Sequence, residues 1–301
     1  METIQYKGWK NCVQFKNDQV TLIVSTDVGP RIIFFALNDG ENIFQNYDDM
    51  MGKSGSDEWM IYGGHRLWAA PEKQPRTYYP DNHPVKVREF EGFVRFTAPV
   101  ETGTNIQKEM DVYFSEEQAG VKVIHRITNR GIWGIELAPW ALSVMKPGGK
   151  CISPFPPRGV HNDDDLLPSN NIVFWSYTNM ADPRWYWGEH FFTLKSEIGN
   201  EVAQKAGSMV QDGWAAYANE DWVFIKYFDY LPEFMYPDFG VNFETFTNES
   251  MLEVETLGPM SWLKPGESVE HVELWELHRL SGSVETEEDI QTNIVPLIKI
   301  H

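Results

Sequence analysis

The sequence is poor in cysteine, in basic residues and in long hydrophobic runs. Its 2 cysteines, Cys12 and Cys151, do not make a disulfide framework and fit a reducing compartment. No apolar run approaches the roughly 18 residues of a membrane span, and the first residues lack the apolar stretch of a signal peptide. The formal net charge of −19 argues against nucleic acid and anionic membranes as partners. We therefore expect a cytoplasmic protein.

Helical periodicity is also scarce, and residues 285–300 are the one stretch that reads as a helix, opened by acidic residues. Elsewhere apolar and polar residues alternate with a period of two, and turn signals recur about every 8 to 12 residues, as in sandwiches and barrels. The sequence predicts an all-β fold in one domain spanning residues 1–301. Two irregular stretches, 46–84 and 146–171, interrupt the alternation, and long ordered loops on β scaffolds often carry sites.

Acidic residues occupy one face of a predicted hairpin. With a turn at residues 248–249, Glu244 pairs with Glu253 and Asn242 with Glu255, all on the same face. Like charges directly opposite each other destabilise a sheet, so some gain must offset them. One interpretation is a solvated face that resists aggregation. The other is a ligand-binding face, where crowding raises the proton affinity of a carboxylate, as a general base near neutral pH requires.

A second group of chemistry-bearing residues lies in the stretch 59–84. A double glycine there allows close approach of the backbone to a ligand. Arg66 can donate to hydroxyls or to a carboxylate, and Trp68 can supply a stacking face. His65 and His83 can exchange protons near pH 7, although a structural hydrogen bond explains a single histidine equally well.

Metal and cofactor motifs are missing. His65, His83 and Asp81 could ligate zinc, but no zinc-binding spacing is present. The acidic turn at 161–168 lacks the glycine and the distal glutamate of an EF-hand. Nucleotide-binding and nucleophile-elbow motifs are absent as well. We expect no metal and no cofactor.

Three segments carry a family resemblance: "GGHRLWAAPE" from residue 63, "LEVETLGP" from residue 252 and "SWLKPGES" from residue 261. In their order and type, together with the β pattern, they resemble the galactose mutarotase-like superfamily, which includes aldose 1-epimerases and hexose-6-phosphate epimerase-like proteins. The resemblance is one of a divergent branch. It implies a β-supersandwich with few short helices, and an isomerase that interconverts sugar anomers by general acid–base catalysis.

The resemblance also implies roles for individual residues. Glu255 would be the general base, while Arg66 approximates a substrate-binding arginine and Asp182 a substrate-binding acid. The family's acid is a histidine on a middle strand, but the similar stretch here has Trp140 and no histidine. His65 or His83, the latter similar to a loop histidine of the family, would then act as the acid. The expected groove residues are Arg66, Trp68, Trp140, Asp182, Arg184 and Glu244.

Two other functions stay open from the residues alone. The groove could bind a sugar without chemistry, which the missing strand histidine favours. Alternatively, Glu244 and Glu255 could act as a carboxylate pair in a lyase or hydrolase of oligosaccharides. In each case the partner is a small-molecule sugar or sugar derivative. The identity of the sugar, its phosphorylation and the oligomeric state are not indicated by the sequence.

Overall fold

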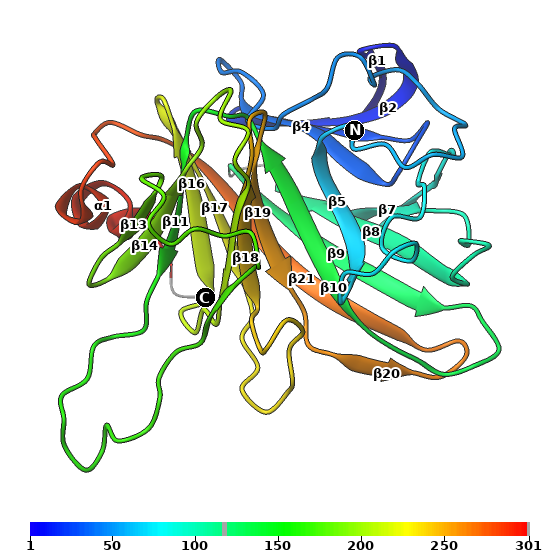
Figure 1. Ribbon diagram of the computed structural model, residues 1–301. Coiled ribbons are helices and arrows are strands. Elements are labelled where there is room, and N and C mark those ends of the chain that lie inside the picture. Colours follow the sequence, from blue (N-terminus) through cyan, green and yellow to red (C-terminus); the bar gives the residue numbers. More distant parts are fainter. Residues whose placement is uncertain (116–118, 300–301) are drawn as a thin grey trace.

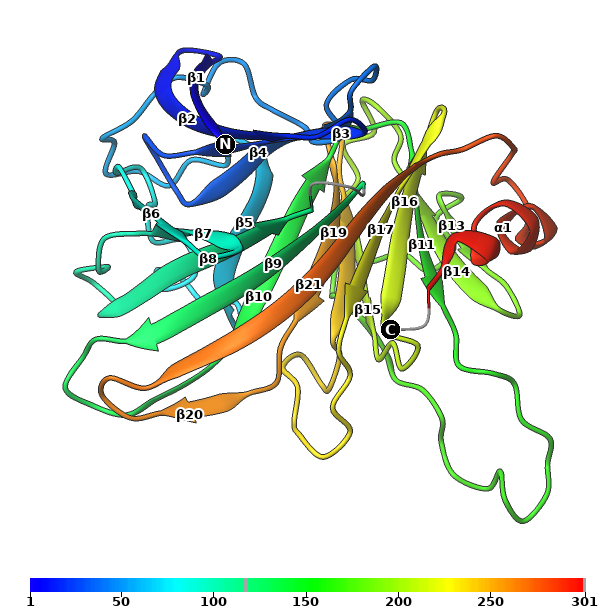
Figure 2. The same ribbon diagram turned by 180° about the vertical axis from the view of Figure 1, so that it is seen from behind.

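Two large antiparallel sheets make up the protein, which is described here by a computed structural model covering residues 1–115 and 119–299 (Figures 1 and 2). The first sheet contains, in spatial order, β1 (Glu2–Tyr6), β2 (Trp9–Lys16), β3 (Val20–Ser25), β4 (Arg31–Leu37), β5 (Gly64–Ala70), β10 (Ile135–Met145), β19 (Leu252–Leu257), β18 (Phe243–Thr247), β15 (Gln204–Ser208) and β12 (Ile172–Phe174), with β20 (Ser261–Leu263) paired to one end of β10. The all-β prediction is confirmed.

The second sheet packs against the inner face of the first. Its order is β13 (Trp185–Trp187), β14 (Phe191–Lys195), β11 (Lys150–Pro154), β16 (Trp214–Asn219), β17 (Trp222–Phe228), β21 (Ser268–Arg279), β9 (Gly120–Asn129), β8 (Ile106–Phe114), β7 (Phe93–Thr97) and β6 (Lys86–Phe90). Figure 2 shows β21 and β9 crossing in front of β10 and β19. The main hydrophobic core lies between the sheets and includes residues of both, such as Val254 and Phe224.

The helix expected near the end of the chain is present as α1 (Glu287–Asn293), followed by the 3-10 turn η1 (Val295–Leu297). Thr286 caps α1 by accepting from the backbone N–H of Asp289, and the Asp289 carboxylate accepts from the backbone N–H of Thr286. This capping box explains where the helix begins. Among the described residues, no helix is both long enough and apolar enough to cross a membrane.

The two irregular stretches were predicted too long, because each contains a strand. β5 lies inside 46–84 and β11 inside 146–171, and every residue of both strands is buried. Strands buried on both faces lose the alternation that identifies a half-exposed strand, so the pattern did not reveal them. The remaining loop 155–171 extends away from the sheets (Figure 1).

The predicted hairpin of β18 and β19 exists, but its register differs by two residues. Glu244 lies opposite Glu255, and Phe246 lies opposite Glu253, because the connection is longer than the assumed two-residue turn. Since side chains alternate with a period of two, a shift of two leaves every residue on its predicted face. The acids therefore do share one face of the sheet.

Candidate functional site

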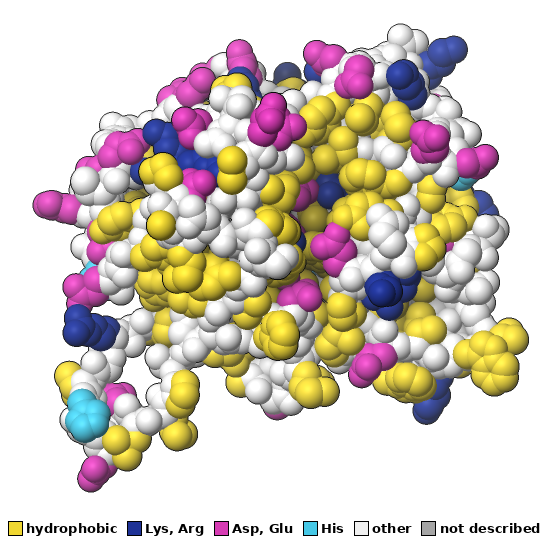
Figure 3. Space-filling model, viewed as in Figure 1, with side chains coloured by type: hydrophobic (Ala, Val, Ile, Leu, Met, Phe, Trp, Pro, Cys, Tyr) yellow, Lys and Arg dark blue, Asp and Glu magenta, His cyan; other side chains and the backbone are white. Residues whose placement is uncertain are grey.

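The outer face of the first sheet, turned away from the second sheet, gathers the acids and tryptophans of β5, β10, β18 and β19. In the middle of the sheet, Leu142 of β10 lies between Arg66 and Glu255, and Glu255 lies opposite Glu244. Figure 3 shows this face hollowed at its centre, with basic and acidic side chains inside a largely hydrophobic rim. We call this region the hollow; its residues are Arg66, Trp68, Trp140, Lys205, Glu244, Glu253 and Glu255.

Glu255 lies at the base of the hollow and is fully buried. Its Oε2 accepts hydrogen bonds from Trp140 Nε1 at 2.9 Å and from Lys205 Nζ at 3.1 Å. Its Oε1 has no partner among the described residues. Burial raises the pKa of Glu255 to about 7, and the Lys205 ammonium limits the rise. The carboxyl group can therefore gain or lose a proton near neutral pH.

Lys205 offsets the repulsion between the two opposed glutamates. Its Nζ lies 2.7 Å from Glu244 Oε2 and 3.1 Å from Glu255 Oε2. Burial disfavours the ammonium, but the two carboxylates outweigh burial and raise the pKa of Lys205 well above its usual value. The ammonium also lies 4.6 Å from the ring centre of Trp140 and 4.7 Å from that of Trp175.

Glu244 holds its proton more tightly than an exposed glutamate does. Burial is the main cause that raises its pKa well above the usual range, and the nearby Glu255 and Asp238 add to the rise against the opposing Lys205. The ammonium of Lys205 between the two carboxyl groups offsets the like-charge repulsion that the sequence pattern implied.

Arg66 supplies donors on the same face. Its Nη2 donates to Glu253 Oε1 at 3.0 Å, and its guanidinium lies 4.4 Å from the ring centre of Trp68. Its Nε and Nη1 are buried without a partner in the part of the chain that the structure describes. Buried N–H groups are normally paired, so these two are suited to a ligand's oxygen atoms.

Aromatic rings line one side of the hollow. Trp68 contacts Trp140, Trp59 and Tyr78 with ring centres 5.3, 5.6 and 5.0 Å apart. Such rings present apolar faces on which the C–H side of a small polar ligand can pack. Trp59, Trp175 and Lys205 were not predicted as groove residues; Lys205 reaches the hollow through a contact 50 residues away in sequence, and Trp59 from the loop just before β5.

The expected roles of the two histidines do not fit the structure. His65 points into the core, since it alternates with Arg66 along β5, and its Nδ1 is paired with Ser143 Oγ at 2.9 Å. His83 is exposed and lines a cavity together with Leu67, which also lies on the opposite face of β5 from Arg66. Neither ring shares the face that carries Glu255.

Asp182 and Arg184 also depart from the predicted groove roles. They pair with each other through two hydrogen bonds of 2.9 Å, and Arg184 Nη2 donates to the carbonyl of Val202 at 2.6 Å. The pair fastens the segment before β13 to the segment before β15. Its charges compensate each other, so a structural role explains both residues.

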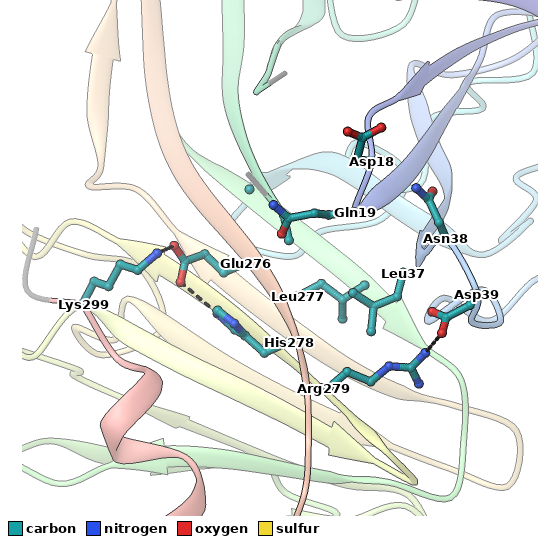
Figure 4. A pocket seen from close by; sticks show the side chains of 12 residues that line it. Asp18, Gln19, Leu37, Asn38, Asp39, Glu276, Leu277, His278, Arg279 and Lys299 are labelled. Carbon is teal, nitrogen blue, oxygen red and sulfur yellow. Dashed lines mark hydrogen bonds and ion pairs between the residues drawn. The ribbon is translucent and has the colours of Figure 1, made fainter. Parts of the chain in front are cut away.

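A separate cavity of about 820 Å³ lies between the end of β21 and the turns after β2 and β4 (Figure 4). Most of its charged side chains, Asp18 excepted, are paired with one another. Glu276 contacts His278 and Lys299, and Arg279 contacts Asp39. The cavity is large but gathers few unpaired functional groups, so we do not assign the site to it.

Comparisons with known proteins agree with this fold. The sequence matches no family model and no curated protein. Among solved structures, it is similar to a galactose mutarotase-like protein from Lactobacillus casei, with a TM-score of 0.54, 11% identity, and coverage of 89% of this chain and 100% of the other. It is also similar to a candidate aldose 1-epimerase from Escherichia coli K12, with a TM-score of 0.53, 12% identity, and coverage of 90% and 99%.

A galactose mutarotase related enzyme from Lactobacillus acidophilus gives a TM-score of 0.52 at 8% identity, with coverage of 89% of this chain and 97% of the other. The fold is therefore the galactose mutarotase-like β-sandwich. At these identities the likeness extends to the fold, and the chemistry must be argued from the residues of this chain.

Proposed function

We propose that this protein is an enzyme of the aldose 1-epimerase type, which binds a sugar in the hollow and interconverts its anomers. One observation carries the proposal. On a single aromatic-lined face, Glu255 presents an unpartnered acceptor and Arg66 presents unpartnered donors. A sugar offers hydroxyl groups that both donate and accept, and a C–H face for the rings. The names of the structural neighbours agree with a sugar ligand.

Glu255 is the general base in this proposal. With a pKa of about 7 it is substantially ionised at neutral pH, and its buried Oε1, which has no partner among the described residues, can accept from the anomeric hydroxyl. Trp140 and Lys205 hold Oε2 and fix the direction in which the carboxylate faces. A positioned base with a pKa near the working pH is the efficient choice for proton transfer.

Glu244 is the general acid, in place of the histidines expected from the sequence. It lies directly opposite Glu255, and burial raises its pKa well above the usual range, which suits a proton donor. As Glu255 takes the proton from the anomeric hydroxyl, Glu244 gives one to the ring oxygen, and the bond between the anomeric carbon and the ring oxygen breaks. The open aldehyde turns about its C–C bond and closes on its other face, which returns both protons.

Polarimetry on freshly dissolved α-sugars tests the proposal. We expect the wild-type protein to accelerate mutarotation, and Glu255→Gln and Glu244→Gln each to lower the rate by about 10²- to 10⁴-fold, the usual contribution of a positioned acid or base. His83→Gln is the matched control, because this exposed side chain lies off the face, and it should leave the rate unchanged. Absence of acceleration by the wild type across common aldoses would contradict the proposal.

A non-catalytic sugar-binding protein is the second candidate. It is favoured by Trp140, which stands where the family resemblance places a catalytic histidine and instead donates to Glu255. A raised melting temperature with a sugar, without turnover of it, would support this alternative. An oligosaccharide hydrolase is less well supported, because Glu244 and Glu255 lie directly opposite each other on adjacent strands, nearer than hydrolytic carboxylate pairs usually lie. A reducing-end assay tests that third function.

A further inference from the structure

A second cluster of ionisable side chains lies between the two sheets, behind the strands that carry the hollow. It is independent of the proposed function. His65 of β5, His125 of β9 and Glu273 of β21 are all fully buried and converge between the two sheets. The two Nε2 atoms are 2.6 Å apart, and Glu273 Oε2 lies 3.7 Å from His65 Nε2 and 4.0 Å from His125 Nε2. Three typical metal-ligand atoms therefore surround one point.

The hydrogen bonds of the imidazoles direct lone pairs to that point. His125 Nδ1 lies 3.1 Å from the carbonyl oxygen of His271. A carbonyl can only accept, so Nδ1 carries the proton, and Nε2 of a neutral ring is a bare acceptor facing His65. Ser143 Oγ, 2.9 Å from His65 Nδ1, can accept from that nitrogen in the same way. Two bare nitrogens at this distance repel each other unless a cation lies between them.

Glu273 is held as an anion with one oxygen facing the histidines. Its Oε1 accepts from Lys226 Nζ at 2.8 Å and from Thr256 Oγ1 at 2.5 Å, and its Oε2 accepts from Trp275 Nε1 at 2.8 Å. The Lys226 ammonium beside the carboxyl group favours its ionised form. Hydrogen bonds that orient carboxylate and imidazole ligands are the usual outer shell of a metal site.

From this geometry we infer that His65, His125 and Glu273 bind a divalent transition metal, with zinc as the best match to two imidazoles and one carboxylate. Ligands about 2.1 Å from a tetrahedral zinc are about 3.4 Å apart. The imidazoles must separate by about 0.8 Å, and the carboxylate must approach by about 0.3–0.6 Å, to reach that spacing.

Such a site joins β5 of the first sheet to β9 and β21 of the second. Because all three ligands are fully buried, the ion has to enter while the chain folds. Its binding free energy would then contribute to folding, as in structural zinc sites. The expectation of no metal rested on the missing spacing around His65, His83 and Asp81. His65, His125 and Glu273 lie 60 and 148 residues apart along the chain, so no spacing motif connects them.

The test first strips metal from the full-length protein in denaturant with chelator. The protein is then refolded either with Zn²⁺ or without metal, and bound metal is measured by mass spectrometry after desalting. We expect one zinc per chain, a higher melting temperature with zinc, and loss of the bound metal in His125→Gln. His83→Gln is the control and should keep the metal. Refolding with Co²⁺ should give the visible absorption bands of cobalt bound to nitrogen and oxygen ligands, which tests the wild type even if His125→Gln does not fold.

NMR of ¹⁵N-labelled histidines separates this site from a direct hydrogen bond between the rings. With metal, both rings carry their proton on Nδ1. Without metal, His65 would carry its proton on Nε2 and donate it to His125. Folded wild-type protein that retains no zinc or cobalt after refolding, with the Nε2–H form of His65, would overturn the inference.

Discussion

Glu255 shows how much of the proposed chemistry depends on the surroundings of one carboxyl group. The same side chain on an exposed strand would be a fully ionised, weak base at neutral pH. Here burial raises its proton affinity, while Trp140 and Lys205 hold one oxygen and leave the other without a partner. The position of the residue on the outer face was predictable from alternation, whereas its burial was not.

The rate of mutarotation is expected to rise with pH through about 7, because Glu255 must be ionised to act as a base. The measurement is kcat/KM for an aldose by polarimetry between pH 5 and 9, corrected for the uncatalysed reaction. In Glu255→Gln the rise should disappear along with most of the activity. A wild-type profile that is flat across this range would contradict the assigned base.

The free energy of unfolding is expected to depend on pH through the ionisation of Glu255. The folded-state pKa of Glu255 lies above its unfolded value of 4.5, so its contribution to stability is fully present below pH 4.5 and is lost as pH rises through about 7. Glu255→Gln cannot ionise. Its free energy of unfolding relative to wild type should therefore increase between pH 4.5 and 8, by up to roughly 3 kcal/mol. Urea unfolding at both pH values measures this, and an unchanged difference would argue against the raised pKa.

At the scale of elements, β5, β10 and β19 each serve two environments. Arg66 and Glu255 face the hollow, while their neighbours His65 and Thr256 face the buried cluster between the sheets. Alternation in the sequence predicted which residues of β19 share a face, and the shift of two in the hairpin register did not alter that result. Most strands other than the fully buried β5 and β11, the late helix and the acidic face were therefore predictable from local pattern.

The rest of the site was not predictable, for a physical reason. Lys205 contacts Glu255 from a position 50 residues away, and Trp59 contacts Trp68 from a separate loop. Local pattern does not indicate which distant segment covers a face. His65 was expected in a loop, but β5 runs there, and a strand sends His65 to the face opposite Arg66.

The helix α1 offers an independent check on local structure. Thr286→Ala removes the side chain that accepts from Asp289 N–H. We expect a loss of about 1 kcal/mol, seen as a decrease in Tm of roughly 2–4 °C, because a free helical N–H is left unpaired. Mutarotation should be unaffected, since α1 packs on the second sheet, beside β13 and β14 (Figure 1). A Tm equal to that of wild type would show that the cap contributes nothing.

On the scale of the whole molecule, the charge of −19 and the paired cations of the hollow favour an uncharged ligand. Lys205 pairs with the ionised Glu255, and Arg66 with Glu253. An anionic ligand would have to displace these pairs and approach against the overall field.

We therefore expect neutral aldoses to bind more tightly than their phosphates. Affinity for the neutral sugar should also be nearly constant between low and high salt, because screening acts on net charge. Calorimetric titration at two ionic strengths measures both. Tighter binding of the phosphate, with affinity that falls as salt rises, would show that Arg66 and Lys205 act as an anion site instead.

The two-sided use of β19 has a consequence for how this chain can vary. A single residue inserted ahead of Glu255 would rotate the rest of the strand by half a turn, placing Thr256 toward the ligand and a charged carboxylate among the core residues. Catalysis and folding would fail together. A substitution in this strand therefore leaves its two faces in place, whereas an insertion or deletion does not.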